Sequence, residues 1–244
     1  MARAKRGGRG KGGPGGRQLS ERVKTARGRP ISSTRWLSRQ LNDPYVARAR
    51  AEGYRSRAAY KLAEIDERFH LFKTGGRVVD LGAAPGGWTQ VAVERVRAGK
   101  SGGGQVLAVD LAEMEPVQDA AFMRLDFLEA DAETKIAAAL GGPADVLLSD
   151  MAAPATGVAR VDHLRIMALC EAVLEFANAI LAPDGALVAK VLRGGGEAEF
   201  VRALKRAFRK VKHVKPPASR ADSSEMYVVA TGYRGDPEAD QPPG

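Results

Sequence analysis

Short apolar runs alternate with segments of helical periodicity between residues 77 and 209. The runs have the length and composition of buried strands and cover residues 77–83, 105–111, 122–128, 145–151 and 185–192. The helical segments cover residues 87–96, 132–140, 162–181 and 197–209. Because a strand–helix–strand unit makes a right-handed crossover, this order predicts an α/β fold with a mostly parallel sheet and helices on both faces.

The two ends of this region depart from the alternation. A helix is predicted before it, over 55–69, where apolar residues recur at helical spacing: Ala59, Leu62, Ile65 and Phe69. After it, residues 210–216 and 225–233 follow one another across a short connection without a helical segment. Strands joined in this way pair antiparallel, so the last strand of the sheet is predicted to be antiparallel to its neighbour.

Positive charge is concentrated at the N-terminus. Residues 1–35 contain 11 Lys and Arg, one acid and no aromatic residue. Because such a Gly- and Arg-rich segment cannot bury enough apolar surface to fold, we predict a disordered tail over 1–35, a folded domain over 36–234 and a flexible polar tail over 235–244. The expected partner of the basic tail is a polyanion such as RNA, and the alternative is a solubilising extension.

Two further basic clusters lie within the predicted domain. The first contains Arg48, Arg50, Arg55, Arg57 and Lys61. The second contains Arg202, Lys205, Arg206, Arg209, Lys210, Lys212 and Lys215. Either cluster could be a solvated helix face, but together with the tail they favour a nucleic-acid substrate over a small molecule.

Membrane and metal-binding classes find little support. The N-terminus lacks the apolar stretch of a signal peptide and no apolar run approaches the length that spans a bilayer, so a cytoplasmic protein is expected. The single cysteine, Cys170, lies on a helical apolar pattern and is predicted to be a core residue. The three histidines (His70, His163 and His213) lack ligand spacing, so no metal site is predicted.

A glycine-rich turn follows the first predicted strand, in the stretch VVDLGAAPGGWTQ. Gly82, Gly86 and Gly87 lie between the strand and the next helix, where glycines let a ligand approach the backbone and the helix offers free N–H donors. A dinucleotide-binding turn has the pattern G-x-G-x-x-G, which this loop lacks at the second glycine. The turn therefore indicates a ligand other than a dinucleotide.

Two acidic residues are predicted near the ends of the next two strands. Asp110 ends the second strand and Asp126 lies in the third, close to the sheet edge where open α/β sheets bind ligands. Either carboxylate alone could merely cap a helix. A glycine loop without a phosphate-binding lysine, followed by two acids, suits a nucleoside that carries positive charge, and S-adenosylmethionine fits this description.

The stretch GALVAKVLRGGG, residues 185–196, places Lys190 inside an apolar strand. A buried ammonium without a partner costs several kcal/mol, unless the lysine extends its head to water at the strand end. Asp150 ends the preceding strand, and Glu225 begins the antiparallel last strand, so both are expected at the same sheet edge as Lys190. These three residues are predicted to form a polar cluster.

Five motifs occur in the order SRAAYKL, VVDLGAAPGGWTQ, LLSDMA, LVAKV and SSEMYVVATG. This set resembles the FtsJ/RrmJ family of 2′-O-ribose methyltransferases, and in particular its bacterial members that act on a uridine of 23S ribosomal RNA. The resemblance covers about residues 35–234, and the glycine loop is its most specific part. The long basic tail departs from the family pattern, and this departure concerns substrate selection more than chemistry.

The resemblance implies a class I S-adenosylmethionine-dependent methyltransferase fold, which is Rossmann-like, and a set of site residues. The implied catalytic residues are Lys61, Asp150, Lys190 and Glu225. The implied cofactor contacts are Gly86, Trp88, Asp110, Asp126 and Asp150. The implied partner is 23S ribosomal RNA or the large ribosomal subunit, bound by a monomer without metal.

The expected chemistry is attack of a ribose 2′-hydroxyl on a sulfonium methyl group. Lys190 is the central candidate, as a general base if it is neutral or as an orienting donor if it is charged. Two alternatives stay open at this stage. One is a 2′-O-methyltransferase for transfer RNA, an mRNA cap or another RNA, and the other is a ribosome-assembly factor that binds RNA without catalysis.

Overall fold

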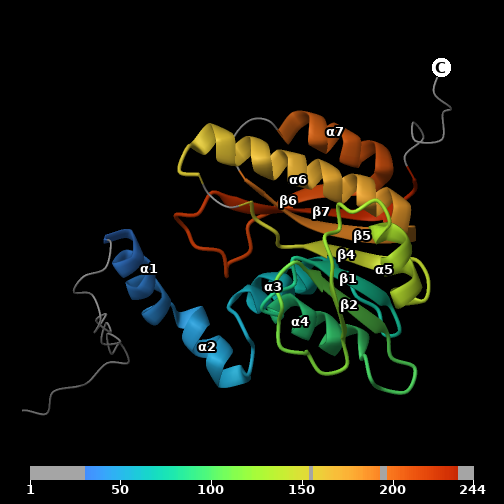
Figure 1. Ribbon diagram of the computed structural model, residues 1–244, viewed down its shortest axis with the longest axis horizontal. Coiled ribbons are helices and arrows are strands. Elements are labelled where there is room, and N and C mark those ends of the chain that lie inside the picture. The colour runs from blue at the N-terminus through green and yellow to red at the C-terminus, as the bar shows by residue number, and fades with distance from the viewer. Residues whose placement is uncertain (1–30, 154–155, 193–196, 236–244) are drawn as a thin grey trace, which may run out of the picture. The chain divides into compact units, whose positions relative to one another are not determined.

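The computed structural model describes residues 31–153, 156–192 and 197–235 (Figure 1). It divides into two compact units, one up to Ala47 and one from Arg48 onward. Most of the predicted basic tail lies outside the described residues, although its last residues, 31–35, belong to a helix. The predicted C-terminal tail lies outside them from residue 236.

Two helices precede the first predicted one. They are α1 (Ile31–Leu41) and α2 (Pro44–Glu52), which crosses the boundary between the two units. Asp43 caps α2, because its carboxylate accepts the backbone N–H of Tyr45 at 3.0 Å, and Pro44 occupies the first helical position. This Asp-Pro start signal was available in the sequence, but the few apolar residues of α2 give it no clear periodicity.

The unit from Arg48 onward is built on a seven-stranded sheet in the order β3-β2-β1-β4-β5-β7-β6. The strands are β1 (Arg77–Leu81), β2 (Gln105–Asp110), β3 (Ala121–Arg124), β4 (Ala144–Ser149), β5 (Leu181–Leu192), β6 (Phe208–Val214) and β7 (Glu225–Tyr233). Strands β1 to β5 pair in parallel, whereas β7 is antiparallel to both β5 and β6. The predicted parallel sheet with an antiparallel last strand is therefore confirmed.

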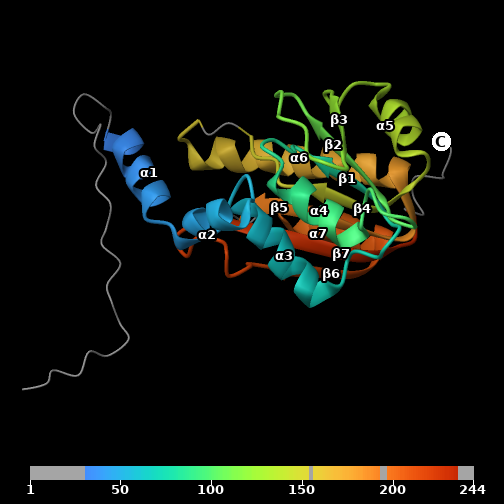
Figure 2. The ribbon, with the colours of Figure 1, turned by 90° about the horizontal axis from the view of Figure 1, so that it is seen from below.

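Helices cover both faces of this sheet, as predicted (Figure 2). One face packs against α3 (Ala58–Phe69) and α4 (Gly87–Val96), and the other against α5 (Ala132–Leu140), α6 (Ala159–Ile180) and α7 (Glu197–Ala207). Fully buried strand residues such as Val79, Leu147 and Leu187 pack against the layer of α5, α6 and α7, each contributing about 1.5–3 kcal/mol. Cys170 lies in this core, as predicted.

Several predicted boundaries differ from the observed ones for local reasons. β3 ends at Arg124 and does not reach residue 128, because the Asp126 carboxylate accepts the N–H of Leu128 at 3.0 Å and turns the chain. β5 begins at Leu181, directly after α6, and an irregularity opposite residues 144–146 separates its first residue from the regular part that starts at Ala186. The sequence pattern predicts only that regular part.

Candidate active site

Lys190 lies in β5 with only 8% of its surface exposed, so its charge requires partners. Its Nζ is 2.8 Å from Asp150 Oδ1 and donates to the main-chain oxygen of Asp150 at 2.6 Å. Asp150 directly follows β4, whose last residue pairs with the residue before Lys190. The two neighbouring strand ends thus provide the partner that the lysine needs, and it does not extend to water.

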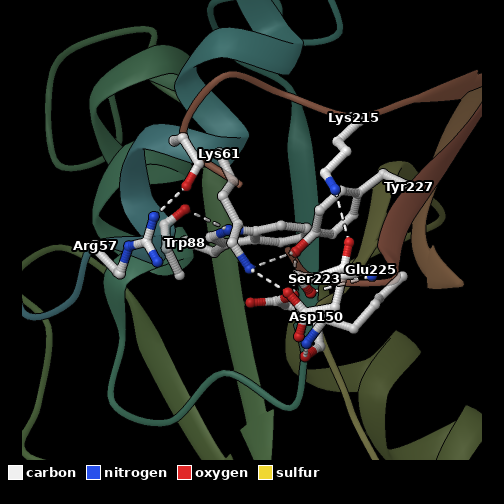
Figure 3. A network of polar contacts seen from close by, with 11 residues as sticks. Arg57, Lys61, Trp88, Asp150, Lys215, Ser223, Glu225 and Tyr227 are labelled. Atoms are coloured by element: carbon white, nitrogen blue, oxygen red, sulfur yellow. Dashed lines mark hydrogen bonds and ion pairs between the residues drawn. The ribbon is translucent and has the colours of Figure 1, made fainter. Parts of the chain in front are cut away.

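Lys61 and Glu225 join the same edge from a helix and from the last strand (Figure 3). Lys61 lies in α3, is buried, and has its Nζ 3.3 Å from Glu225 Oε2. Glu225 begins β7 and pairs with Leu192 at the end of β5. The four residues of the predicted catalytic set are therefore close together, including Lys61, which no periodicity could place.

Tyr227 connects the two ion pairs and was not predicted. Its hydroxyl accepts a hydrogen bond from Lys61 Nζ at 2.9 Å and donates one to Asp150 Oδ1 at 2.6 Å (Figure 3). Its side chain is fully buried, and burial followed by the negative charge of Asp150 raises the pKa of this phenol well above its usual range. The hydroxyl therefore stays protonated and acts as a permanent donor to Asp150.

A simple signal in the sequence points to Tyr227. Alternate residues of a strand share a face, so Tyr227 lies on the same side of β7 as Glu225. In the antiparallel register it is also directly opposite Lys190. We refer to Lys61, Asp150, Lys190, Glu225 and Tyr227 as the lysine cluster.

A cavity of about 620 Å³ opens beside the lysine cluster, at the carboxyl ends of the parallel strands. Three acidic residues line it: Asp110, Asp126 and Asp150. The remaining walls are largely apolar and include Val109, Leu111, Leu125, Phe127, Leu128, Ala168 and Ala172. The volume is that of a small-molecule site, and Asp150 belongs to both the cavity and the lysine cluster.

Asp110 holds the glycine loop in place. Its carboxylate accepts the N–H of Ala84 at 2.9 Å and that of Ala112 at 2.8 Å. In the same loop Gly82 has a φ of +71°, and a Cβ there would lie 2.3 Å from Met151 Cγ. The loop thus passes so close to the cavity wall that only glycine fits at residue 82.

Gly86 and Trp88, two predicted cofactor contacts, do not line the cavity. Gly86 caps α4 with a φ of +105°. The Trp88 indole is buried, donates to the main-chain oxygen of Ala58 at 2.8 Å, and packs on the Tyr227 ring with 5.5 Å between centroids. Trp88 therefore supports the lysine cluster by packing on the ring of Tyr227.

The first basic cluster is partly structural. Arg55 donates to the main-chain oxygens of Pro85 at 3.3 Å, Pro116 at 2.5 Å and Glu115, and so ties the glycine loop to the segment after β2. Arg57 donates to the main-chain oxygen of Ala218, in the β6–β7 connection. These two guanidiniums and the buried Lys61 therefore make contacts within the protein, whereas Arg48 and Arg50 of the same cluster are exposed.

Among the described residues, no group of three or more His, Cys, Asp or Glu is arranged to hold a metal ion. Over the same residues, no helix has the length and apolar character needed to cross a membrane.

Residues 54–233 match the family model described as FtsJ-like methyltransferase. The chain belongs to this family. FtsJ-like relatives named "Ribosomal RNA large subunit methyltransferase E" include a Parvibaculum lavamentivorans protein, 59% identical over 94% of this chain and 93% of its own. The Cereibacter sphaeroides relative of the same name is 60% identical over 91% of this chain and 93% of its own.

A solved structure shares the fold of this FtsJ-like chain. A Plasmodium falciparum protein assigned as a ribosomal RNA methyltransferase is 28% identical and has a TM-score of 0.67, over 75% of this chain and 100% of that one. The predicted methyltransferase fold is therefore confirmed. Membership in a methyltransferase family also implies a methyl donor.

Proposed function

We propose that this FtsJ-like protein methylates the ribose 2′-hydroxyl of a uridine in 23S ribosomal RNA of the large ribosomal subunit, in the cytoplasm, with S-adenosylmethionine as the donor. The names of the close relatives support the ribosomal substrate. The observation that carries the proposal is that Asp150 belongs to two sites. It lines the cavity, and its carboxylate binds Lys190 and Tyr227. A donor bound in the cavity would therefore lie next to the lysine cluster.

The residues of the cavity fit S-adenosylmethionine, which when bound supplies an electrophilic methyl group on a positively charged sulfur. Apolar walls that include Leu111, Leu125 and Leu128 suit the flat adenine ring. We propose that Asp110 and Asp126 hold the nucleoside and that Asp150 faces the charged end. Gly86 would act through the backbone of the glycine loop, and Trp88 through its packing on Tyr227.

Lys190 is proposed to hold the acceptor hydroxyl. An ammonium has three donor hydrogens, and two of them are used on the carboxylate and the main-chain oxygen of Asp150. The third can bind the ribose oxygen and orient its lone pair toward the methyl group. Transfer would break the bond between the methyl carbon and the sulfonium sulfur, which would keep the electron pair, and would form the bond to the ribose oxygen. A carboxylate of the lysine cluster would accept the hydroxyl proton.

The test is nucleoside mass spectrometry on RNA that lacks the modification. Purified protein and S-adenosylmethionine are incubated separately with large ribosomal subunits, free 23S RNA and transfer RNA, all from cells without this protein. We expect 2′-O-methyluridine in the ribosomal samples only. Methylation of transfer RNA alone would overturn the ribosomal substrate, and methylation of none would favour a non-enzymatic assembly factor.

Replacing Tyr227 with Phe should lower kcat about tenfold. The change removes the acceptor of Lys61 and the donor to Asp150, and an unsatisfied buried polar group typically costs about 1–3 kcal/mol. S-adenosylmethionine affinity, measured by calorimetry, should change little. Tyr233→Phe is the matched control, because Tyr233 lies in the same strand and donates to the main-chain oxygen of Asn178. If both variants lose equal activity, Tyr227 has only a structural role.

Replacing Asp110 with Ala should raise the dissociation constant for S-adenosylmethionine about 10–100-fold. The change removes charge-assisted hydrogen bonds worth roughly 1.5–3 kcal/mol and frees the glycine loop at Ala84. Glu113→Ala is the control, since it removes the same charge from an exposed side chain of the following segment that pairs with Arg124. The dissociation constants of both variants and wild type are measured by calorimetric titration with S-adenosylmethionine. Equal affinity of the Asp110 variant and wild type would contradict the cofactor role.

A further inference from the structure

Five exposed large apolar side chains lie around one place in the unit from Arg48 onward. Among the described residues, six large apolar side chains are exposed: Leu41, Leu111, Leu128, Val158, Val161 and Leu164. Leu111 and Leu128 line the cavity, and the last three lie at the start of α6, which forms another wall of that cavity. Because clustered exposed apolar surface in a folded protein usually marks an interaction site, this arrangement indicates that a ligand binds here.

The exposed residues of α6 continue the face of the helix that lines the cavity. Arg165, Ala168 and Ala172 are cavity residues. Val161 and Leu164 precede them by three or four positions, the spacing of neighbours on one helix face. Their exposed fractions are 39% and 60%, so the apolar wall extends beyond the cavity as an open rim. We call Val158, Val161 and Leu164 the apolar rim.

The rim lies beyond the sheet edge at which Lys190 and the cavity are found. α6 leads directly into β5, and Cys170 Sγ donates to the main-chain oxygen of Lys190 at 3.2 Å. A helix rises 1.5 Å per residue, so Leu164 lies about 9 Å and Val161 about 14 Å farther along the axis. Because α6 runs opposite to β5, these residues project past the sheet edge where Lys190 is found.

The charges around the rim favour a nucleic acid. Arg160 and Arg165 are exposed on the same turns of the helix. The one nearby acid of these turns, Asp162, is occupied, because its carboxylate accepts the Thr156 N–H and hydroxyl at 2.6 Å and the Gly157 N–H at 3.2 Å. Apolar side chains flanked by arginines match a base flanked by phosphates.

We propose that the apolar rim receives an unstacked base of the RNA substrate, that of the acceptor nucleotide or its direct neighbour. This inference rests on the proposed function, because a ribose held at Lys190 must bring its base and phosphates across the mouth of the cavity. Contact with aliphatic side chains separates the base from its stack and selects a single-stranded or flipped nucleotide. The rim thus helps select the RNA, while the cavity holds the cofactor.

The test compares two leucines on either side of the boundary. Leu164→Ser should raise KM for large ribosomal subunits about tenfold, with kcat and S-adenosylmethionine affinity close to wild type. Leu128→Ser, in the cavity wall, should weaken S-adenosylmethionine binding and leave KM for large ribosomal subunits close to wild type. Leu164→Phe should retain a low KM, because an aromatic ring offers the base a larger face. Weakened cofactor binding by Leu164→Ser, or an unchanged KM, would overturn the proposal.

A second readout does not depend on catalysis. Binding of a short single-stranded oligouridine that carries 2-aminopurine is followed by fluorescence, whose intensity reports whether the base is stacked. Leu164→Ser should weaken this binding and reduce the fluorescence change, whereas Leu128→Ser should leave both unchanged. If wild type methylates no RNA, the proposed function fails, and this titration still decides whether the rim holds a base. Equal titrations for wild type and Leu164→Ser would contradict the rim.

Discussion

Lys190→Ala should abolish most methyl transfer, with kcat lower by about 10²–10⁴-fold, while S-adenosylmethionine still binds. The reason is geometric: the ammonium is held by two oxygens of Asp150 and leaves its third hydrogen for the acceptor hydroxyl. The cavity that we assign to the cofactor does not include Lys190. Single-turnover rates with saturating RNA, together with calorimetry for the cofactor, measure the two effects separately.

The control for this variant is Lys212→Ala, which removes the same charge from an exposed residue of β6. Circular dichroism should confirm that Lys190→Ala is folded, because the change leaves Asp150 with the Tyr227 hydroxyl as its partner. A variant that is folded, binds the cofactor and turns over at the wild-type rate would remove Lys190 from the mechanism. Loss of cofactor binding would instead place it in the donor site.

The second large effect concerns stability and arises at Asp80, a residue of β1 in the glycine-loop motif. Its side chain is 1% exposed and accepts a hydrogen bond from the Thr89 hydroxyl at 2.7 Å. Burial is the main cause that raises the pKa of this carboxyl to about 7, and the nearby charges of Asp150 and Asp110 add to it. The folded protein therefore holds a proton on Asp80 at pH values where the unfolded chain has lost it.

The direction of the pH dependence follows from this difference. The unfolded carboxyl titrates near 3.8 and the folded one near 7, so between these values the folded state binds more protons. The free energy of unfolding contributed by Asp80 therefore falls as pH rises from about 4 to about 7, and it is constant above that range. At 1.36 kcal/mol per pH unit, the total is about 4 kcal/mol as an upper limit.

Asp80→Asn removes this titration while it keeps the size and an acceptor for Thr89. Its free energy of unfolding relative to wild type should rise steadily from pH 4 to pH 7 and then stay constant. Urea denaturation at several pH values, without cofactor, measures the difference. Glu113→Gln, at an exposed carboxylate, should show no such trend. A constant difference between Asp80→Asn and wild type across the range would mean that Asp80 titrates normally.

Much of the fold and three of the five residues of the lysine cluster could be predicted, because strand ends are visible in the sequence. In a parallel sheet every strand ends at the same edge, so Asp150 and Lys190 had to meet. Glu225 followed from the antiparallel last strand. Lys61 did not, because its position depends on how α3 packs on the sheet, and the periodicity of a helix says nothing about its packing angle.

Tyr227 and Arg55 could not be interpreted from the sequence for one common reason. Polar side chains form hydrogen bonds with other groups of the protein as well as with ligands. Tyr227 looks like an ordinary strand residue until its hydroxyl is placed between Lys61 and Asp150. From the sequence Arg55 is part of a basic cluster, but in the structure its guanidinium donates to three main-chain oxygens. Charge and apolarity can be read from the sequence, but the partner of each group can be read only from the packing.

The position of β7 between β5 and β6 has a consequence for the newly synthesised chain. β7 is the last strand of the described residues to leave the ribosome and it enters the interior of the sheet, so β5 keeps an unpaired hydrogen-bonding edge until residues 225–233 have emerged. Such an edge is open to pairing with other chains. The same nine residues bring Glu225 and Tyr227 to Lys61, so a nascent chain that stops short of them lacks both the partner strand of β5 and two members of the lysine cluster.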